Sequence, residues 1–219
     1  MSKTRALRFA SFALIACFAI PAFGQPDLTA VNMKSYEAET AEQRWHFLFF
    51  DTIGSPGPNF AAAAGAGIDQ LSNKPKEWGQ GAQGYGRRVG SVFGRLAMAT
   101  TFSEATEAAL RLDTRYIPSG SKGFLCRVGY AIGATFFAYD SEGRKRFDPG
   151  PVLGSFSSGV LATKLWYPNR YDPFARGLNR GVSELTTFPI GNLMREFRPE
   201  LKPILDKVKL GGMLPNDLK

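Results

Sequence analysis

Glycines recur at intervals of four residues in three segments that also carry a helical pattern of apolar residues. The three sets are Gly86, Gly90 and Gly94; Gly129 and Gly133; and Gly177 and Gly181. Glycine in a helix interior costs about 1 kcal/mol relative to alanine, so this recurrence needs a compensating gain. Residues four apart lie on one helix face, and each set therefore predicts a smooth groove for a neighbouring helix. This small-xxx-small spacing occurs in membranes and in soluble bundles, so it does not by itself identify the solvent.

The whole chain is predicted to be all-α, because apolar residues recur at spacings of three and four and alternating runs are scarce. We expect one compact domain of about six helices over residues 25–209 and a frayed tail at residues 210–219. The expected helices cover residues 29–52, 60–68, 85–112, 122–139, 151–166 and 173–197, with a short one near 199–208. Pro189 predicts a kink or break inside the segment 173–197.

Residues 1–24 are predicted to be a cleavable signal peptide. Its basic residues are Lys3, Arg5 and Arg8. The apolar stretch over residues 9–23 is shorter than the roughly 20 residues of a membrane span. Cleavage after Gly24 would leave Gln25 as the new N-terminus, in the periplasm or cell envelope. A second interpretation is lipidation at Cys17, because Leu14-Ile15-Ala16-Cys17 fits the lipoprotein cleavage pattern.

Removal of the signal peptide changes the charge and the cysteine content. It takes three of the 27 basic residues and none of the 19 acidic ones, so the net charge falls from +8 to +5. The remaining excess aids solubility or favours an anionic membrane surface, and we favour solubility. Cys126 is the one cysteine left, which excludes an intramolecular disulfide in the mature chain.

The sequence carries no recognisable catalytic set, and we expect no catalytic residues, no metal and no cofactor. His46 is the single histidine, so paired-histidine catalysis and histidine-rich metal sites are excluded. The segment Gly79-Gln-Gly-Ala-Gln-Gly84 matches a dinucleotide-binding pattern, but it follows no predicted strand. We therefore interpret it as a flexible segment before the long helix.

Several arginines are candidates for a ligand-binding site. The candidate residues are Arg88, Arg95 and Arg127, together with Asp113, Arg115 and Tyr116 of the segment Asp113-Thr-Arg-Tyr116. The same helices also carry Arg87, Arg176 and Arg180. If the helix faces converge, the forked guanidinium groups could bind a phosphate or carboxylate. The favoured alternative is that the arginines pair with acids of the chain or project into solvent. The acids considered are Asp69, Asp113, Asp140 and Glu184.

The order of these segments resembles an exported, all-helical bacterial envelope family with no assigned activity. The residues that carry the resemblance are Tyr85-Gly-Arg-Arg88, Asp113-Thr-Arg-Tyr116, Arg127-Val-Gly-Tyr-Ala131, Tyr167-Pro168 and Arg195-Glu-Phe-Arg198. The resemblance covers about residues 28–200, and it implies export and a helical domain. The family carries a His-Gln pair before an Asp-Pro-Arg-Tyr segment, and here Arg111-Leu112 and Thr114 stand in those places. A function that needs the histidine is therefore in doubt for this chain.

These features favour a non-enzymatic exported envelope protein with a structural or a lipid- or partner-binding role. The expected partner is a membrane surface, a lipid or another envelope protein, and we expect no nucleic acid. The alternative is an envelope enzyme acting on lipid or phosphorylated substrates, with the arginines as an anion clamp and Asp113 or Asp140 as acid/base. A third interpretation is a carrier with an apolar tunnel between its helices.

Overall fold

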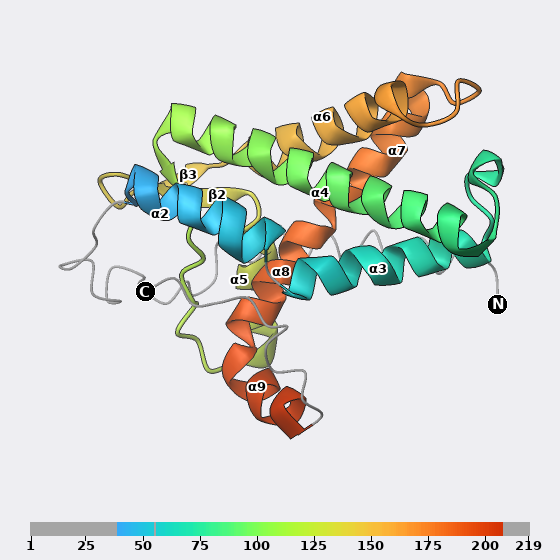
Figure 1. Cartoon of the computed structure of the whole chain (residues 1–219). Helices are drawn as coiled ribbons and strands as arrows, with labels where there is room; N and C mark the ends of the chain where they lie inside the picture. Colours follow the sequence, from blue (N-terminus) through green and yellow to red (C-terminus); the bar gives the residue numbers. More distant parts are fainter. Residues whose placement is uncertain (1–38, 55, 208–219) are drawn as a thin grey trace, which may run out of the picture.

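The computed structural model describes residues 39–54 and 56–207, so the predicted signal peptide and the tail after residue 209 lie outside the described residues. The fold is mostly helical, and it also contains a three-stranded sheet (Figure 1). The predicted helical fold is therefore confirmed in part, and the small sheet is the departure from the predicted all-α chain. No helix among the described residues has the length and apolar character required to cross a membrane.

The described chain begins with a short helix and continues without interruption into a wider turn. Helix α2 spans Ala41–His46, and a π-helical segment, η4, follows over Phe47–Ile53. Thr40 caps α2, because its hydroxyl accepts from the Gln43 amide (3.2 Å) while the Gln43 side chain accepts from the Thr40 amide (2.9 Å). Helix α3 then covers Pro56–Leu71.

The longest helix, α4, spans Gly81–Leu110 and contacts helices on two sides. In Figure 1, α3 lies along one side of α4, and α6 (Gly150–Leu165) lies along the other. The short segment η5 (Lys76–Trp78) precedes α4. Arg111 ends α4 in the left-handed region, at φ 55°. Helix α7 (Pro173–Leu185) packs across α6.

The predicted helix over residues 122–139 is wrong in its second half. Helix α5 covers only Phe124–Gly133, and the chain then forms strand β2 (Phe137–Asp140). Strand β2 pairs antiparallel with β1 (Leu112–Asp113) and with β3 (Lys145–Phe147), with Leu112 opposite Asp140 and Phe137 opposite Phe147. The run Thr-Phe-Phe-Ala-Tyr is rich in β-branched and aromatic residues, which favour a strand.

The predicted break in the segment 173–197 is present, but it does not fall at Pro189. The segment forms α7 and then α8 (Thr187–Glu196), which meet at Thr186. Pro189 lies in the first turn of α8, where backbone N–H groups have no partner inside the helix and proline is tolerated. Helix α9 (Arg198–Lys207) ends the described chain.

The glycine sets divide into two groups in the structure. A Cβ at Gly177 would lie 2.5 Å from the Val160 Cα, and one at Gly181 would lie 2.9 Å from the Phe156 Cα, so only glycine allows this α6–α7 contact. On α6, a Cβ at Gly154 would overlap the Ala99 carbonyl of α4. By contrast, an added Cβ would meet nothing within 4 Å at four other positions: Gly86, Gly90, Gly129 and Gly133. At Gly94 the nearest atom would be on the Trp166 indole, at 3.5 Å.

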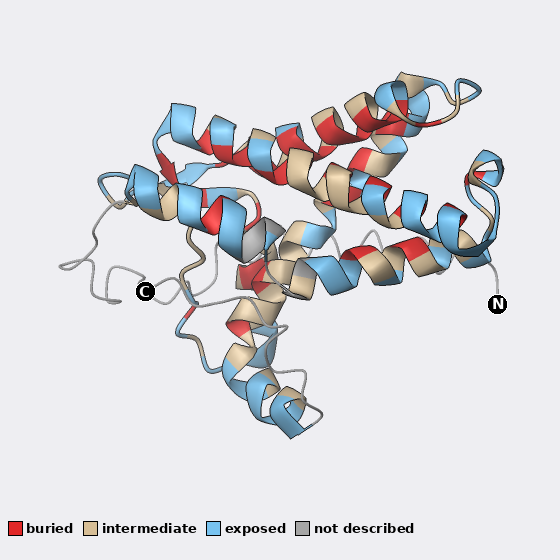
Figure 2. Ribbon diagram, viewed as in Figure 1, coloured by how far each residue is buried: buried red, intermediate tan, exposed pale blue. Residues whose placement is uncertain are grey.

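The interior of the described protein is more polar than a usual globular core. Six of its ten buried hydrophobic residues are alanines: Ala62, Ala66, Ala99, Ala131, Ala138 and Ala162. Nine charged residues are also buried: Arg88, Arg95, Glu104, Glu107, Asp113, Asp140, Asp148, Glu184 and Glu196. In Figure 2 the buried colour follows the facing sides of α4 and α6, and the outward sides of most helices are exposed.

The exterior is correspondingly rich in large apolar side chains. The most exposed of these include Trp45, Phe50, Phe60, Ile68, Leu71, Phe124, Leu125, Phe147, Leu165, Phe174 and Ile204, with exposed fractions from 57% to 89%. Scattered single cases are normal on a soluble protein, but this many large apolar side chains outside, with few of them fully buried, make an unusually apolar exterior.

Candidate binding pocket and the ion pairs around it

Arg88 is fully buried and organises the loop that precedes α4. Its guanidinium donates to the carbonyl oxygens of Lys74 (2.9 Å), Pro75 (3.0 Å) and Gly79 (2.8 Å) and to the side-chain oxygen of Gln70 (2.5 Å). A guanidinium with four acceptors fixes the backbone that carries Trp78. Arg88, predicted as a ligand-binding residue, is therefore placed under a loop and not in an open site.

Arg95 lies two turns further along α4 and forms a buried ion pair. Its Nε atom donates to Glu184 of α7 at 2.6 Å, and its Nη1 atom donates to the hydroxyl of Tyr167 at 2.5 Å. Burial alone lowers the pKa of Arg95, but Tyr167 and Glu184 outweigh burial and raise it above its usual value. The Ser91 hydroxyl accepts from Arg95 (3.2 Å) and from the Trp166 indole N–H (2.9 Å). This network fixes the orientation of Trp166.

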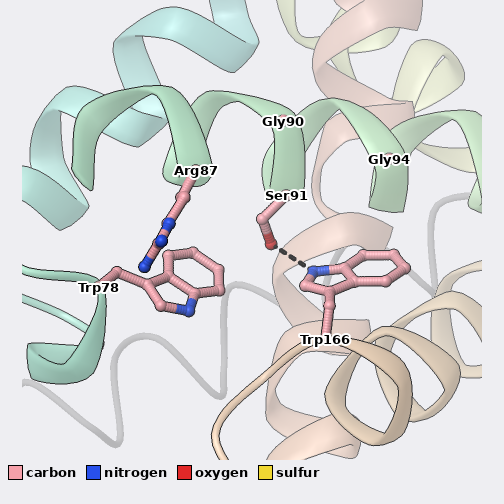
Figure 3. Close-up of a pocket in the computed structure, with 6 residues that line it drawn as sticks. All are labelled: Trp78, Arg87, Gly90, Ser91, Gly94 and Trp166. Carbon is pink, nitrogen blue, oxygen red and sulfur yellow. Dashed lines mark hydrogen bonds between the residues drawn. The ribbon is translucent and has the colours of Figure 1, made fainter. Parts of the chain in front are cut away.

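A pocket of about 500 Å³ lies between the loop that Arg88 holds, which carries Trp78, and the Trp166 side chain that the Arg95 network holds. Its lining residues are Trp78, Arg87, Gly90, Ser91, Gly94 and Trp166. Figure 3 shows Trp78 and Trp166 facing the same space below α4, with the Arg87 side chain reaching towards Trp78. The helix wall between them is bare at Gly90, and the Trp166 ring packs on the backbone at Gly94.

Arg87 differs from the buried arginines because it forms no ion pair or hydrogen bond within the described part of the chain. It is exposed at the rim of the pocket. The pocket therefore combines two indoles with unneutralised positive charge.

Tyr116 and Arg127 belong to a separate network centred on Glu196 of α8. The Glu196 carboxylate accepts from the hydroxyls of Tyr116 (2.7 Å) and Ser119 (2.5 Å) and from the Arg127 Nε (3.0 Å). Arg127 also pairs with Glu200. Burial alone raises the pKa of Glu196, but these donors outweigh burial and lower it below its usual value. This network ties the loop before α5 to α8.

Asp113 and Arg115 pair with each other, at 2.5 Å between Oδ2 and Nη2. Asp113 lines a second pocket, of about 560 Å³, together with Arg44 and Glu104. Arg44 donates to the Leu112 carbonyl (2.6 Å) and lies 3.1 Å from Glu39 and 3.4 Å from Glu104. In this second pocket Arg44 therefore lies beside two acidic side chains, and Arg111 also lines it.

Three acidic side chains are buried next to that pocket: Glu104 and Glu107 on α4, and Asp148 before α6. Burial raises the pKa of Glu104 to about 8, although Arg44 opposes the shift. Burial, together with the neighbouring carboxylate, also raises the pKa of Glu107, and burial raises that of Asp148. Glu107 additionally accepts from the Ser103 hydroxyl at 2.7 Å. Among the residues described, no group of three or more His, Cys, Asp or Glu side chains is arranged to hold a metal ion.

The six residues predicted to bind a ligand thus fall into four separate clusters. Tyr116 and Arg127 meet at Glu196, and Asp113 meets Arg115, but Arg88 and Arg95 have different partners. The arginine faces do not converge on one anion site in the described structure. Asp140, the other predicted acid/base, accepts from the Arg144 amide and from the Arg144 and Arg146 side chains. These hydrogen bonds hold its pKa well below its usual value.

The pocket residues Trp78, Arg87 and Trp166 are absent from the predicted site. The sequence did contain a feature that pointed to Arg87. Arg87 and Arg88 are adjacent on one helix, so their side chains must point in different directions. One of the two was therefore free for a role outside the interior. The two tryptophans lie 88 positions apart in the sequence, and their meeting depends on the α4–α6 packing.

Comparison with protein-family models, with curated proteins and with solved structures gave no match. The function must therefore be inferred from the residues and their geometry.

Proposed function

We propose that this chain is a non-enzymatic exported envelope protein that lies on a membrane surface, with its outward apolar side chains in contact with lipid. The observation that carries the proposal is the apolar exterior, with many large apolar side chains outside and mostly alanine and charged residues fully buried. In water this exterior loses the hydrophobic gain of burial, which is about 1.5 to 3 kcal/mol for each large apolar side chain. Contact with lipid restores that gain.

One apolar region is concentrated enough to be tested. We define the aromatic patch as Trp45, Phe49 and Phe50 on the adjoining α2 and η4, whose exposed fractions are 60%, 51% and 65%. Trp45 and Phe49 stack with ring centroids 5.6 Å apart, so they form one continuous surface. Tryptophan and phenylalanine with a basic net charge suit the boundary between head groups and acyl chains.

The charged residues support a role without catalysis. Asp113 and Asp140 are both held by arginines, and the candidate arginines Arg88, Arg95 and Arg127 each have partners inside the protein. The buried acids Glu104 and Glu107 sit among residues that pair with one another, and their pKa values favour the neutral form. In the neutral form these groups do not present a charged base to a substrate.

Vesicle flotation of the mature chain, residues 25–219, tests the proposal. We expect the protein to float with phosphatidylcholine vesicles, because apolar contact does not require lipid charge. The variant Trp45→Ser/Phe49→Ser/Phe50→Ser should lose most of this binding. Its matched control is Leu165→Ser/Phe174→Ser/Val182→Ser, which removes three exposed apolar side chains from α6 and α7.

A wild-type protein that stays entirely with the soluble fraction would overturn the membrane contact. If the control variant loses vesicle binding and the aromatic-patch variant keeps it, the membrane contact lies on α6 and α7. That result would refute the assigned surface. Export has its own test, which is N-terminal analysis of the protein from fractionated cells. We expect Gln25 as the first residue, whereas a lipidated Cys17 would show a covalent anchor.

A further inference from the structure

We propose that the pocket between Trp78 and Trp166 binds the phosphate-bearing head group of an anionic lipid, with Arg87 pairing with the phosphate. The inference rests on the proposed membrane contact and specifies the lipid class that the protein recognises. The pocket volume of about 500 Å³ is sufficient for a head group and the adjoining glycerol.

The charge of the pocket selects an anion. Arg87 has no acceptor among the described residues, and its forked donors match the oxygens of a phosphate. The nearest acidic residue in sequence, Glu77, is already paired with Arg170 at 2.5 Å. A positively charged group would therefore be repelled, so phosphatidylcholine, which carries the same phosphate together with a choline cation, is disfavoured relative to an anionic lipid.

The two indoles select a ligand that also has an apolar part. Tryptophan is both apolar and a hydrogen-bond donor, which suits it to the zone where head groups meet acyl chains. The Trp166 N–H is already used by Ser91, so this ring presents mainly its apolar surface. A free inorganic phosphate would satisfy Arg87 but would leave both indoles without a contact.

The walls of the pocket are held in place before any ligand enters. Arg88 fixes the loop that carries Trp78, and the Arg95 network fixes Trp166 through Ser91. Trp78 also contacts the Tyr167 ring, with centroids 4.9 Å apart. A preorganised site loses less conformational freedom on binding than a mobile one. The floor remains open at Gly90, where an added Cβ meets nothing within 4 Å.

The test compares binding of the mature chain to phosphatidylcholine vesicles and to vesicles that also contain phosphatidylglycerol. We expect the wild type to bind the anionic vesicles roughly tenfold more tightly, the scale of one charge-assisted contact. Arg87→Gln should abolish this preference and leave binding to phosphatidylcholine unchanged. Gly90→Leu should do the same without a change of charge, because its side chain fills the floor of the pocket. Lys122→Gln, at an exposed lysine outside the pocket, is the charge-matched control and should retain the preference.

Equal binding of the wild type to both vesicle types would overturn the head-group site and leave the proposed membrane contact standing. Absence of binding to either type would overturn the membrane contact itself. Glycerol 3-phosphate, followed by tryptophan fluorescence, separates the two sources of a phosphate ester. A saturable response to it that Arg87→Gln removes, without any vesicle preference, would assign the pocket to a soluble ligand and refute the lipid source. Loss of the preference in Lys122→Gln as well would show general charge attraction and refute the pocket.

Discussion

Replacing Glu104 with glutamine should stabilise the protein at neutral pH. Glu104 is only 6% exposed, and burial raises the pKa of its carboxyl group to about 8 from an ordinary value of 4.5. The charged groups that act on it are Arg44 and Arg195, which lower the pKa, and Glu39 and Asp148, which raise it. Arg44 is 3.4 Å away and has a closer acceptor in the Leu112 carbonyl, so its attraction does not offset burial.

The size of this stabilisation follows from the difference between the Glu104 pKa in the folded protein and in the unfolded chain. Between pH 4.5 and about 8, the folded protein keeps a proton on Glu104 that the unfolded chain has released, so stability falls as pH rises through this window. Each pH unit costs about 1.4 kcal/mol, which reaches roughly 3 kcal/mol at pH 7. Glutamine imitates the protonated carboxyl and releases no proton. We therefore expect Glu104→Gln to raise the free energy of unfolding by about 2 to 3 kcal/mol at pH 7 and by almost nothing at pH 4.5.

Urea unfolding followed by circular dichroism measures this difference in the free energy of unfolding. The measurements are made at pH 4.5, 7 and 8.5, with one mild detergent present in all three buffers. Glu42→Gln is a suitable control, because Glu42 is exposed on α2. A glutamine variant that is less stable than the wild type at pH 7 would refute the reasoning. It would mean that Glu104 is ionised in the fold and that its pairing with Arg44 is a net gain.

Two further perturbations test the packing. Arg95→Met should lower the free energy of unfolding by about 3 to 5 kcal/mol, because it leaves the Glu184 carboxylate buried without its partner. The double variant Arg95→Met/Glu184→Leu should recover much of that loss in the same urea assay, and a double variant as unstable as the sum of both changes would contradict this. Gly177→Ala should destabilise by more than 1 kcal/mol, because its Cβ would lie 2.5 Å from the Val160 Cα. Gly86→Ala should stabilise by up to about 1 kcal/mol, and thermal unfolding that ranks these two variants in the opposite order would refute the close contact.

Helix positions were predictable from the sequence where the local pattern and the packing agree. The long helix predicted over 85–112 is present as α4, and the helix predicted over 151–166 is present as α6. The error after Gly133 arose because an apolar run of this length suits a helix or a buried strand equally well. Its pairing with Leu112-Asp113 decides the outcome, and that pairing joins residues far apart in the chain.

The site was less predictable because the sequence shows which residues are charged but not where their partners lie. Arg95 and Glu184 are 89 positions apart, and Arg127 and Glu196 are 69 apart. A pocket defined by unpaired charge can be recognised only after the pairs have been assigned. The favoured interpretation, that the arginines pair with acids of the chain, describes Arg95 with Glu184 and Arg115 with Asp113. Arg87 forms no such ion pair within the described part of the chain, and it could be recognised as unpaired only after these pairs were known.

The alanine-rich, ion-paired interior has a consequence for how stability changes with temperature. The heat capacity increase on unfolding comes from newly hydrated apolar surface, while newly hydrated polar surface reduces it. In this protein much of the large apolar surface is already outside, and unfolding hydrates buried arginines and carboxylates instead. Its heat capacity change per residue should therefore fall below the usual value of about 12 to 15 cal/mol/K. The stability curve becomes shallow, so that cooling weakens the fold far less than it weakens a protein held by an aliphatic core.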